Sequence, residues 1–309
     1  DLVRSRGLGD VYKRQELIKI TEKLNTQSKC MAYLEKNRWP ETPICPYCNS
    51  NKSSRKTQEF RHTCHNCKRS YSVLVGTLFE STKLPITKWF LAIHLIINAK
   101  KGISSLQLAR DLNVNKNTAW FLQKRIRQAM KDEDCILSGI IEIDETYVGG
   151  SISNKNYFTK LKSSKYHKTG MEHMVPVLGM IQRKGKIILK VLEKASGIEI
   201  KPYIKTKVTS GSTIITDGFG GYYGLNDHFE NHIILNHSKY KRSINKYNTS
   251  TLEGFWTLVK RSFIGQYHKI SKDHLQDYLN ELAFKYNNRK TNMFNLLVTN
   301  LLEPKYAFS

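Results

Sequence analysis

The chain has 309 residues, of which 39% are hydrophobic and 10% aromatic, so it can bury a sizeable core and is not a disordered protein. No apolar run reaches the roughly 18 residues that a bilayer span requires, which argues against a membrane protein. Fifty Lys and Arg against 26 Asp and Glu give a net charge of +24. This excess favours a polyanionic partner, most commonly nucleic acid, over a role in solubility alone.

The first residues, 1–15, start with Asp1 rather than Met and show no helical or strand period. They lack a charged segment followed by an apolar stretch, so they do not form a signal peptide. We predict a non-native or disordered leader here, with a genuine basic arm as the alternative. Without a secretory signal, we expect a cytoplasmic, nucleoid-associated protein in which disulfide bonds are rare.

Four of the six cysteines form two CxxC pairs separated by 15 residues. At this spacing, two short knuckles present four thiolates to one tetrahedral zinc ion, whereas a redox-active pair would need only one CxxC unit. Because four thiolates leave no open coordination position, the zinc is predicted to be structural. His62 and His65 are interpreted as surface residues. The predicted zinc-ribbon domain covers residues 16–80, with ligands Cys45, Cys48, Cys64 and Cys67.

Helical periodicity follows over residues 84–130, within a predicted helical DNA-binding segment at 81–135. Ser104 is placed to cap one helix, and Asn115 or Asn117 to cap the next. A helix, a short turn and a basic helix are typical of a helix-turn-helix reader of the major groove. A three-helix bundle with a solvated basic face is the alternative. The side chains expected on the outer face of the last helix are Lys116, Lys124, Arg125 and Arg127.

Carboxylates in apolar strands are informative in so basic a chain. The run 140–148 is predicted to be a buried strand in which Glu142 and Asp144 share one face and Glu145 takes the other. A second predicted strand ends at Asp217 and is followed by glycines. A carboxylate on a buried strand is costly unless it is paired or binds a metal.

The third informative carboxylate is Glu253, at the start of a predicted amphipathic helix. Lys260 lies seven residues later, about two turns on, and so on the same side. Three carboxylates from two strands and a helix can hold two divalent ions, and hard oxygen ligands favour Mg²⁺ or Mn²⁺. We therefore expect in-line phosphoryl transfer at a carboxylate of the 140–148 strand together with Asp217 and Glu253, with Lys260 facing substrate phosphate; the strand pattern alone does not choose among Glu142, Asp144 and Glu145.

Three other segments have simpler interpretations. The lysine-rich loop 151–168 is either a DNA-contacting insertion or a solvated loop, and His237 is interpreted as a structural histidine. Residues 273–288 are predicted to form an amphipathic helix that covers a sheet. Residues 293–309 are treated as a C-terminal tail without an assigned structure.

Over residues 30–292 the chain resembles IS1595-family insertion-sequence transposases with an ISXO2-like transposase domain. The resemblance rests on the four cysteines and on these motifs: Ile143-Asp-Glu-Thr-Tyr-Val-Gly-Gly150, Thr216-Asp-Gly-Phe-Gly-Gly-Tyr222 and Glu253-Gly-Phe-Trp256 with Lys260-Arg261. The pattern His274-Leu, Tyr278-Leu, Glu281, Phe284, Tyr286-Asn287 and Arg289 extends it. Ser250 departs from the family, whose members commonly have Asn at this position.

The resemblance implies an α/β fold with an RNase H-like mixed-sheet catalytic domain, here at 136–292, preceded by the zinc ribbon and the helical segment. It implies a DD(E/N) site at Asp144, Asp217 and Glu253, with Lys260 as the accompanying basic residue. The expected function is transposition: binding of terminal inverted repeats, metal-dependent strand cleavage and 3′-hydroxyl transfer into target DNA, by a dimer or higher oligomer. The alternatives are a catalytically decayed or domesticated DNA-binding protein and another RNase H-like nuclease.

Overall fold

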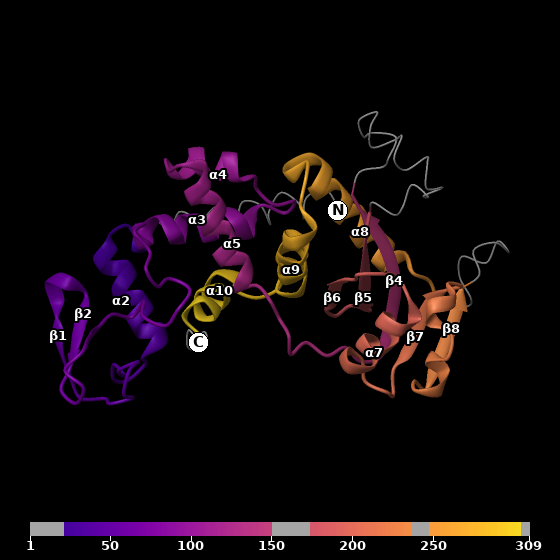
Figure 1. Cartoon of the computed structure of the whole chain (residues 1–309), viewed down its shortest axis with the longest axis horizontal. Helices are drawn as coiled ribbons and strands as arrows, with labels where there is room; N and C mark the ends of the chain where they lie inside the picture. Colours follow the sequence, from indigo (N-terminus) through magenta and orange to yellow (C-terminus); the bar gives the residue numbers. More distant parts are fainter. Residues whose placement is uncertain (1–21, 150–173, 236–246, 304–309) are drawn as a thin grey trace, which may run out of the picture. The chain divides into compact units, whose positions relative to one another are not determined.

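The computed structural model describes residues 22–149, 174–235 and 247–303. Within these ranges the chain forms two compact units (Figure 1): a helical unit of residues 22–130 and 291–303, and a sheet unit within residues 131–290. The predicted leader, the lysine-rich loop 151–168 and His237 lie outside the described residues. None of the helices in the described ranges combines the length and hydrophobicity that a membrane span needs.

The helical unit contains a small three-stranded antiparallel sheet of order β1-β2-β3. The third strand is short, because only Ser70 and Tyr71 pair with β2. The elements of this unit are α2 (Gln27–Arg38), β1 (Ser53–Lys56), β2 (Arg61–Cys64), β3 (Ser70–Tyr71), α3 (Ile86–Asn98), α4 (Ser105–Leu112), α5 (Lys116–Gln128) and α10 (Met293–Leu302).

Helices α4 and α5 form the predicted helix-turn-helix arrangement. The Ser104 hydroxyl accepts a hydrogen bond from the Gln107 backbone N–H, and Asn115 caps α5 through the Asn117 backbone N–H. Asn113 ends α4 in the left-handed region, with φ of 49°, which asparagine tolerates better than most residues. The N-caps predicted from the sequence at Ser104 and Asn115 are therefore confirmed.

The predicted outer basic face of α5 is wrong in its second half. Arg127 is 2% exposed, and Arg125 donates from Nη1 to the carbonyl oxygens of Leu78 and Glu80 at 3.4 and 2.9 Å. Both guanidinium groups are thus directed into the unit, since a long side chain can satisfy buried carbonyls while its stem fills apolar space. Lys116, at the start of α5, is exposed as expected.

The residues treated as a tail include helix α10, which belongs to the core of the helical unit. Phe294 is buried and stacks on His94, with ring centroids 4.3 Å apart. The Tyr33 hydroxyl donates to Asn295 Oδ1 at 2.8 Å. The apolar spacing of α10 therefore serves packing against α2 and α3.

The sheet unit is built on a mixed five-stranded sheet of order β6-β5-β4-β7-β8. Strand β5 is antiparallel to β4 and β6, whereas β7 and β8 run parallel to β4. The first strand in sequence is thus central, which is the RNase H-like arrangement. The elements of the sheet unit are β4 (Ile140–Val148), β5 (Val175–Gln182), β6 (Ile187–Val191), α7 (Gly197–Lys207), β7 (Thr213–Asp217), β8 (Asn231–Leu235), α8 (Ser250–Ser262), the π-helical turn η7 (Phe263–Tyr267) and α9 (Lys272–Asn287).

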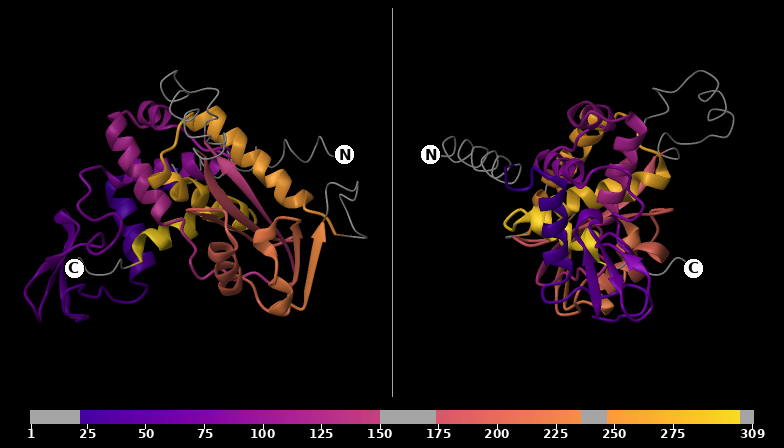
Figure 2. Two further views of the ribbon diagram at one scale, coloured as in Figure 1. Left: turned by 45° about the vertical axis from the view of Figure 1, so that its right-hand side comes forward. Right: turned by 90° about the vertical axis from the view of Figure 1, so that its left-hand side faces the viewer.

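Alternation along the strands gives the sheet two separate cores. Ile141 and Ile143 of β4 pack with α7 on one face. On the other face, apolar residues of β5 and β6 pack with α8 and α9, and the long α8 runs beside the strands (Figure 2). Burial of Leu275 and Leu279 confirms that the helix predicted over 273–288 covers the sheet.

Helix α8 is attached to β4 by a fully buried carboxylate, Glu142. Its oxygens accept the backbone N–H groups of Thr251 and Leu252, each at 3.0 Å, and the Thr251 hydroxyl at 2.9 Å. Arg183 Nε donates to the same carboxylate at 3.0 Å. Glu142 therefore caps the N-terminus of α8, and a negative charge there also suits the helix dipole.

Replacing Glu142 with Gln should lower the free energy of unfolding by about 3–5 kcal/mol, because Arg183 loses its anionic partner in a buried position. Urea unfolding monitored by circular dichroism measures the change. The control is Glu230→Gln, an exposed carboxylate, expected to change stability by about 0.5 kcal/mol or less. Equal stability of the two variants would contradict the proposed contribution of Glu142.

Candidate functional site

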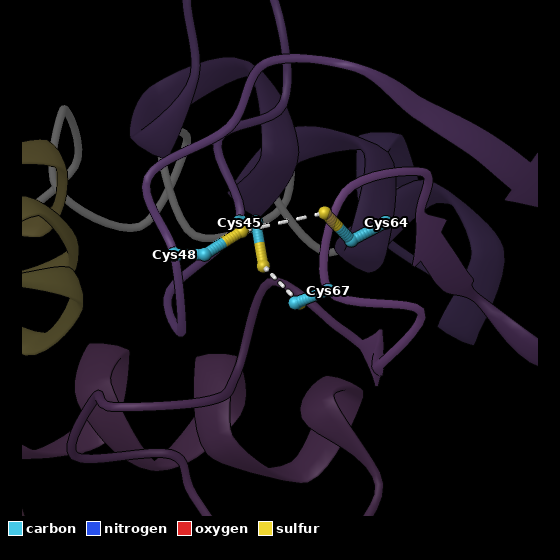
Figure 3. A group of neighbouring side chains, drawn as sticks. All are labelled: Cys45, Cys48, Cys64 and Cys67. Carbon is cyan, nitrogen blue, oxygen red and sulfur yellow. Dashed lines mark hydrogen bonds between the residues drawn. The ribbon is translucent and has the colours of Figure 1, made fainter.

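The four predicted zinc ligands come together in the helical unit. Their sulfur atoms all lie within 4.8 Å of one another (Figure 3). The Cys45–Cys67 and Cys48–Cys64 sulfur separations are 3.7 and 3.5 Å, close to the edge of about 3.8 Å of a tetrahedron with Zn–S bonds of about 2.3 Å. The cluster fits a closed, structural zinc site.

The two knuckles have the same backbone geometry. In each, the residue after the second cysteine has a positive φ, 56° at Asn49 and 61° at Lys68. Each of these residues donates its N–H to the carbonyl of the first cysteine of its pair, Cys45 or Cys64. The turn directs backbone N–H groups at the sulfurs, and the N–H of Ser50 is the main cause that lowers the pKa of Cys48 to about 6. The backbone therefore favours a thiolate at Cys48, the form that binds zinc.

The two histidines near the knuckles differ in their surroundings. His65 is exposed as predicted, but His62 is 3% exposed, so its assignment to the surface is wrong. Its ring stacks on Tyr71, and its Nε2 lies 3.2 Å from Glu35 of α2. His62 thus links the ribbon to α2 and is not a member of the four-sulfur cluster.

Asp144 and Asp217 lie on adjacent parallel strands at the centre of the sheet. Glu142 of β4 pairs with Ile215 of β7, and the two aspartates each follow this pair by two residues. Asp217 is the last residue of β7, and its Oδ1 accepts the backbone N–H of Phe219 at 3.0 Å. The parallel register therefore brings the two carboxylates to the same level of the sheet.

Asp144 lies in a strongly anionic and partly buried environment. The pKa of Asp144 is raised to about 6, mainly by burial; the negative charges of Asp217 and Glu253 also raise it, and a hydrogen bond from Trp256 lowers it. The interaction with both carboxylates shows that the three predicted acidic residues form one electrostatic group. Such mutual repulsion is relieved by protons or by cations.

Glu253 and Lys260 are both exposed on α8, in its first and last turns. The Thr249 hydroxyl donates to Glu253 Oε1 at 2.9 Å. Seven residues correspond to about two helical turns, so Lys260 follows Glu253 on the same side of α8 at about 10 Å along the axis. Among the described residues, only the four cysteines gather three or more possible metal ligands within 4.8 Å, so the carboxylates are spaced more widely.

A fourth carboxylate, Glu145, is close to the same group from the other face of β4. The Tyr222 hydroxyl donates to Glu145 Oε2 at 2.5 Å, and Tyr222 is fully buried. Burial raises the pKa of Glu145 to about 7, and the charges of Asp217 and Asp144 contribute. This pair ties the loop after Asp217 back to β4. The sequence places Glu145 on the opposite face but gives no sign of its partner 77 residues away.

Ser250, the position that departs from the family pattern, interacts locally. Its backbone N–H and hydroxyl both donate to Asn248 Oδ1. The Asn248 carbonyl in turn accepts Arg183 Nη2 at 3.0 Å. Ser250 thus supports the turn that leads into α8.

Comparisons with known proteins agree with this arrangement. Residues 136–287 match the ISXO2-like transposase domain, and residues 25–70 match the transposase zinc-ribbon domain, both of IS1595 transposases. Together the two matches cover more than half of the chain. The chain belongs to the IS1595 family.

Relatives of this IS1595-family protein are found in archaea and bacteria. An uncharacterized protein in transposable element ISH50 of Halobacterium salinarum is 26% identical over 254 residues, which cover 78% of this chain and 84% of the relative. An uncharacterized transposase-like protein of Haemophilus influenzae is 29% identical over 105 residues, covering 34% and 84% respectively. A crystal structure of a pre-cleavage Mos1 transpososome aligns over 97% of this chain and 99% of that chain, with 11% identity and a TM-score of 0.27, which is too low to bear on the fold.

The Cys64→Ser variant should lose bound zinc, because three thiolates remain around a site that requires four ligands. Metal analysis of the purified protein should show about one zinc per chain for the unmodified protein and much less for the variant, with a lower melting temperature of the helical unit. Cys135→Ser, a buried cysteine of the sheet unit, is the control and should retain zinc. Equal zinc contents in both variants would contradict the assignment.

The Asp144→Asn variant should be more stable than the unmodified protein at pH 7 without added divalent cations, by about 1–2 kcal/mol after allowance for partial solvent access. The raised pKa of Asp144 means that the folded state binds a proton more tightly than the unfolded state, so stability from this group is lost as pH rises from about 4 to about 6. The advantage of the variant should therefore disappear near pH 4. Urea unfolding of both proteins from pH 4 to pH 7 measures this stability difference. A difference that does not change with pH would contradict the raised pKa of Asp144.

Proposed function

We propose that this IS1595-family transposase binds the terminal inverted repeats of its insertion sequence and catalyses metal-dependent DNA strand cleavage and 3′-hydroxyl strand transfer. The observation that carries the proposal is the position of Asp144 and Asp217 on adjacent parallel strands, each two residues beyond the paired Glu142 and Ile215, with Glu253 near enough to raise the pKa of Asp144. Three carboxylates that repel one another destabilise the folded state. Their presence together therefore favours a role in metal binding.

Asp144, Asp217 and Glu253 are the proposed ligands of Mg²⁺ or Mn²⁺. All three offer hard carboxylate oxygens, and their wider spacing than the cysteine cluster is compatible with two ions rather than one. When bound, such ions stabilise charge on the attacking and leaving oxygens of a phosphoryl transfer. Lys260, exposed on the same side of α8, is proposed to hold a substrate phosphate, which orients the scissile bond relative to Glu253.

The helical unit is the proposed DNA-end-binding part, in which α5 enters the major groove. The exposed residues at the start of α5 are Lys116, Asn117 and Thr118, and the N-terminal residues of a recognition helix are those that contact base edges. The zinc ribbon, with the exposed His65 and a basic hairpin, is proposed to add contacts to the DNA backbone. Two ends must be joined in one complex, so we propose a dimer or higher oligomer.

An in vitro reaction tests the function. Purified protein is incubated with Mg²⁺ and DNA that carries the element's own ends, and products are separated on denaturing gels. We expect cleaved ends and joined products, with Asp217→Asn and Glu253→Gln reduced at least about 10³-fold, because each loses a ligand charge. Both variants should bind the DNA ends with nearly unchanged affinity, since the proposed recognition helix is in the other unit.

Three results would contradict parts of this proposal. Cleavage by either variant at the normal rate would exclude the assigned site. Specific end binding without any cleavage in Mg²⁺ or Mn²⁺ would indicate a decayed, binding-only protein. Nicks without joined products would indicate a nuclease rather than a transposase.

A further inference from the structure

Trp256 has a polar contact that its core position does not require. The side chain is 4% exposed and packs in the apolar layer between α8 and the sheet. Its Nε1–H donates to Asp144 Oδ2 at 3.0 Å. The helical spacing of Trp256 suits a core position, but spacing carries no information about where the indole N–H points.

The sheet is shaped to receive this indole ring. Gly179 of β5 lies directly opposite Asp144 in the antiparallel register. A Cβ atom at Gly179 would lie 2.5 and 2.7 Å from two ring carbons of Trp256, closer than real contacts allow. Glycine weakens the interior of a strand, and its presence here allows the ring to lie against the backbone beside Asp144.

The same hydrogen bond connects Asp144 to the helix that carries Glu253, another proposed metal ligand. Trp256 and Glu253 are three residues apart on α8, so they lie on adjacent positions of one helix. The contact to Asp144 therefore fixes the helix that carries Glu253 relative to the strand that carries Asp144. Glu142, two residues before Asp144, attaches the start of α8 in the same way.

We propose that Trp256 is a positioning residue of the metal site: its N–H holds one oxygen of Asp144 and orients the carboxylate toward the ions. This inference rests on the proposed function. A neutral donor suits the task, because Lys or Arg at this place would add a positive charge that competes with the cation. Hydrogen bonds to metal-ligating groups typically affect metal affinity about 10- to 100-fold.

The Trp256→Phe variant tests the inference, because it keeps an aromatic ring in the layer and removes the N–H. Mn²⁺ binding to the full-length, zinc-loaded protein without DNA is measured by electron paramagnetic resonance of free Mn²⁺. We expect affinity to fall about tenfold. The Mg²⁺ concentration for half-maximal cleavage should rise similarly, whereas the rate at saturating Mn²⁺ should recover.

Trp89→Phe is a matched control, because Trp89 is 2% exposed and also donates one indole hydrogen bond, to Thr82 Oγ1 at 3.0 Å, but in the helical unit. It should bind Mn²⁺ like the unmodified protein. If Trp256→Phe is unfolded by circular dichroism, benzothienylalanine at position 256, with sulfur in place of N–H, replaces it. A folded variant without the N–H that binds Mn²⁺ normally overturns the inference.

The Asp144→Asn variant distinguishes failure of the proposed metal site from failure of the proposed role of Trp256. Normal Mn²⁺ binding and cleavage by Asp144→Asn would refute the proposed metal site itself. Loss of both in Asp144→Asn, together with normal Mn²⁺ affinity in the variant without the N–H, would leave the proposed function intact and refute only the role of Trp256. Weakened Mn²⁺ affinity in both variants supports both.

Discussion

The cost of placing carboxylates on the central strand governs the arrangement of the sheet unit. Strand β4 carries three of them, and each one is compensated differently. Glu142 is fully buried but has an ion pair and the N-terminus of α8. Glu145 has the Tyr222 hydroxyl on the α7 face. Asp144 has the neutral indole N–H of Trp256, and its pKa is raised to about 6.

The partners of these three carboxylates distinguish their roles, although all three are acidic residues. A carboxylate that already has an arginine and two backbone N–H groups, as Glu142 has, has little need of a cation and serves to hold α8 in place. Asp144 faces two other carboxylates, so a cation would relieve its repulsion most directly. The family resemblance implies Asp144 rather than its two neighbours. The hydrogen bonds supply a physical reason for preferring it to Glu142, whereas Glu145 differs by lying on the other face of β4, next to Tyr222.

Local patterns in the sequence were sufficient for several features of this protein. The caps at Ser104 and Asn115 and the four cysteines depend on neighbours a few residues away, and strand alternation placed Glu142 and Asp144 on the face opposite Glu145. The mixed sheet itself was expected from the family resemblance, since strand order is not encoded in periodicity.

Other features depend on contacts distant in sequence and could not be predicted from patterns. Glu142 meets Leu252 across 110 residues, and nothing in the α8 segment indicates that its cap comes from a strand. Arg127 and His62 have polar side chains that a pattern assigns to the surface, yet the fold supplies partners or apolar cover for them. Long amphipathic side chains are the residues for which hydrophobic periodicity is least informative.

The contrast between the +24 charge of the whole chain and the anionic group at Asp144, Asp217 and Glu253 has a consequence for the proposed reaction. Basic residues attract DNA over long distances, but the carboxylates repel the phosphate that must enter the site. Divalent cations remove this conflict, because they neutralise the carboxylates and attract phosphate at once. Under the proposed function, the contacts around Asp144 keep the anionic site ordered before cations and DNA bind: Glu142 holds α8, Tyr222 holds the loop after Asp217, and Trp256 holds the Asp144 carboxylate. Tyr222 and Trp256 are neutral donors and the charge of Arg183 is paired with Glu142, so the proposed cation would be the strongest compensation for Asp144.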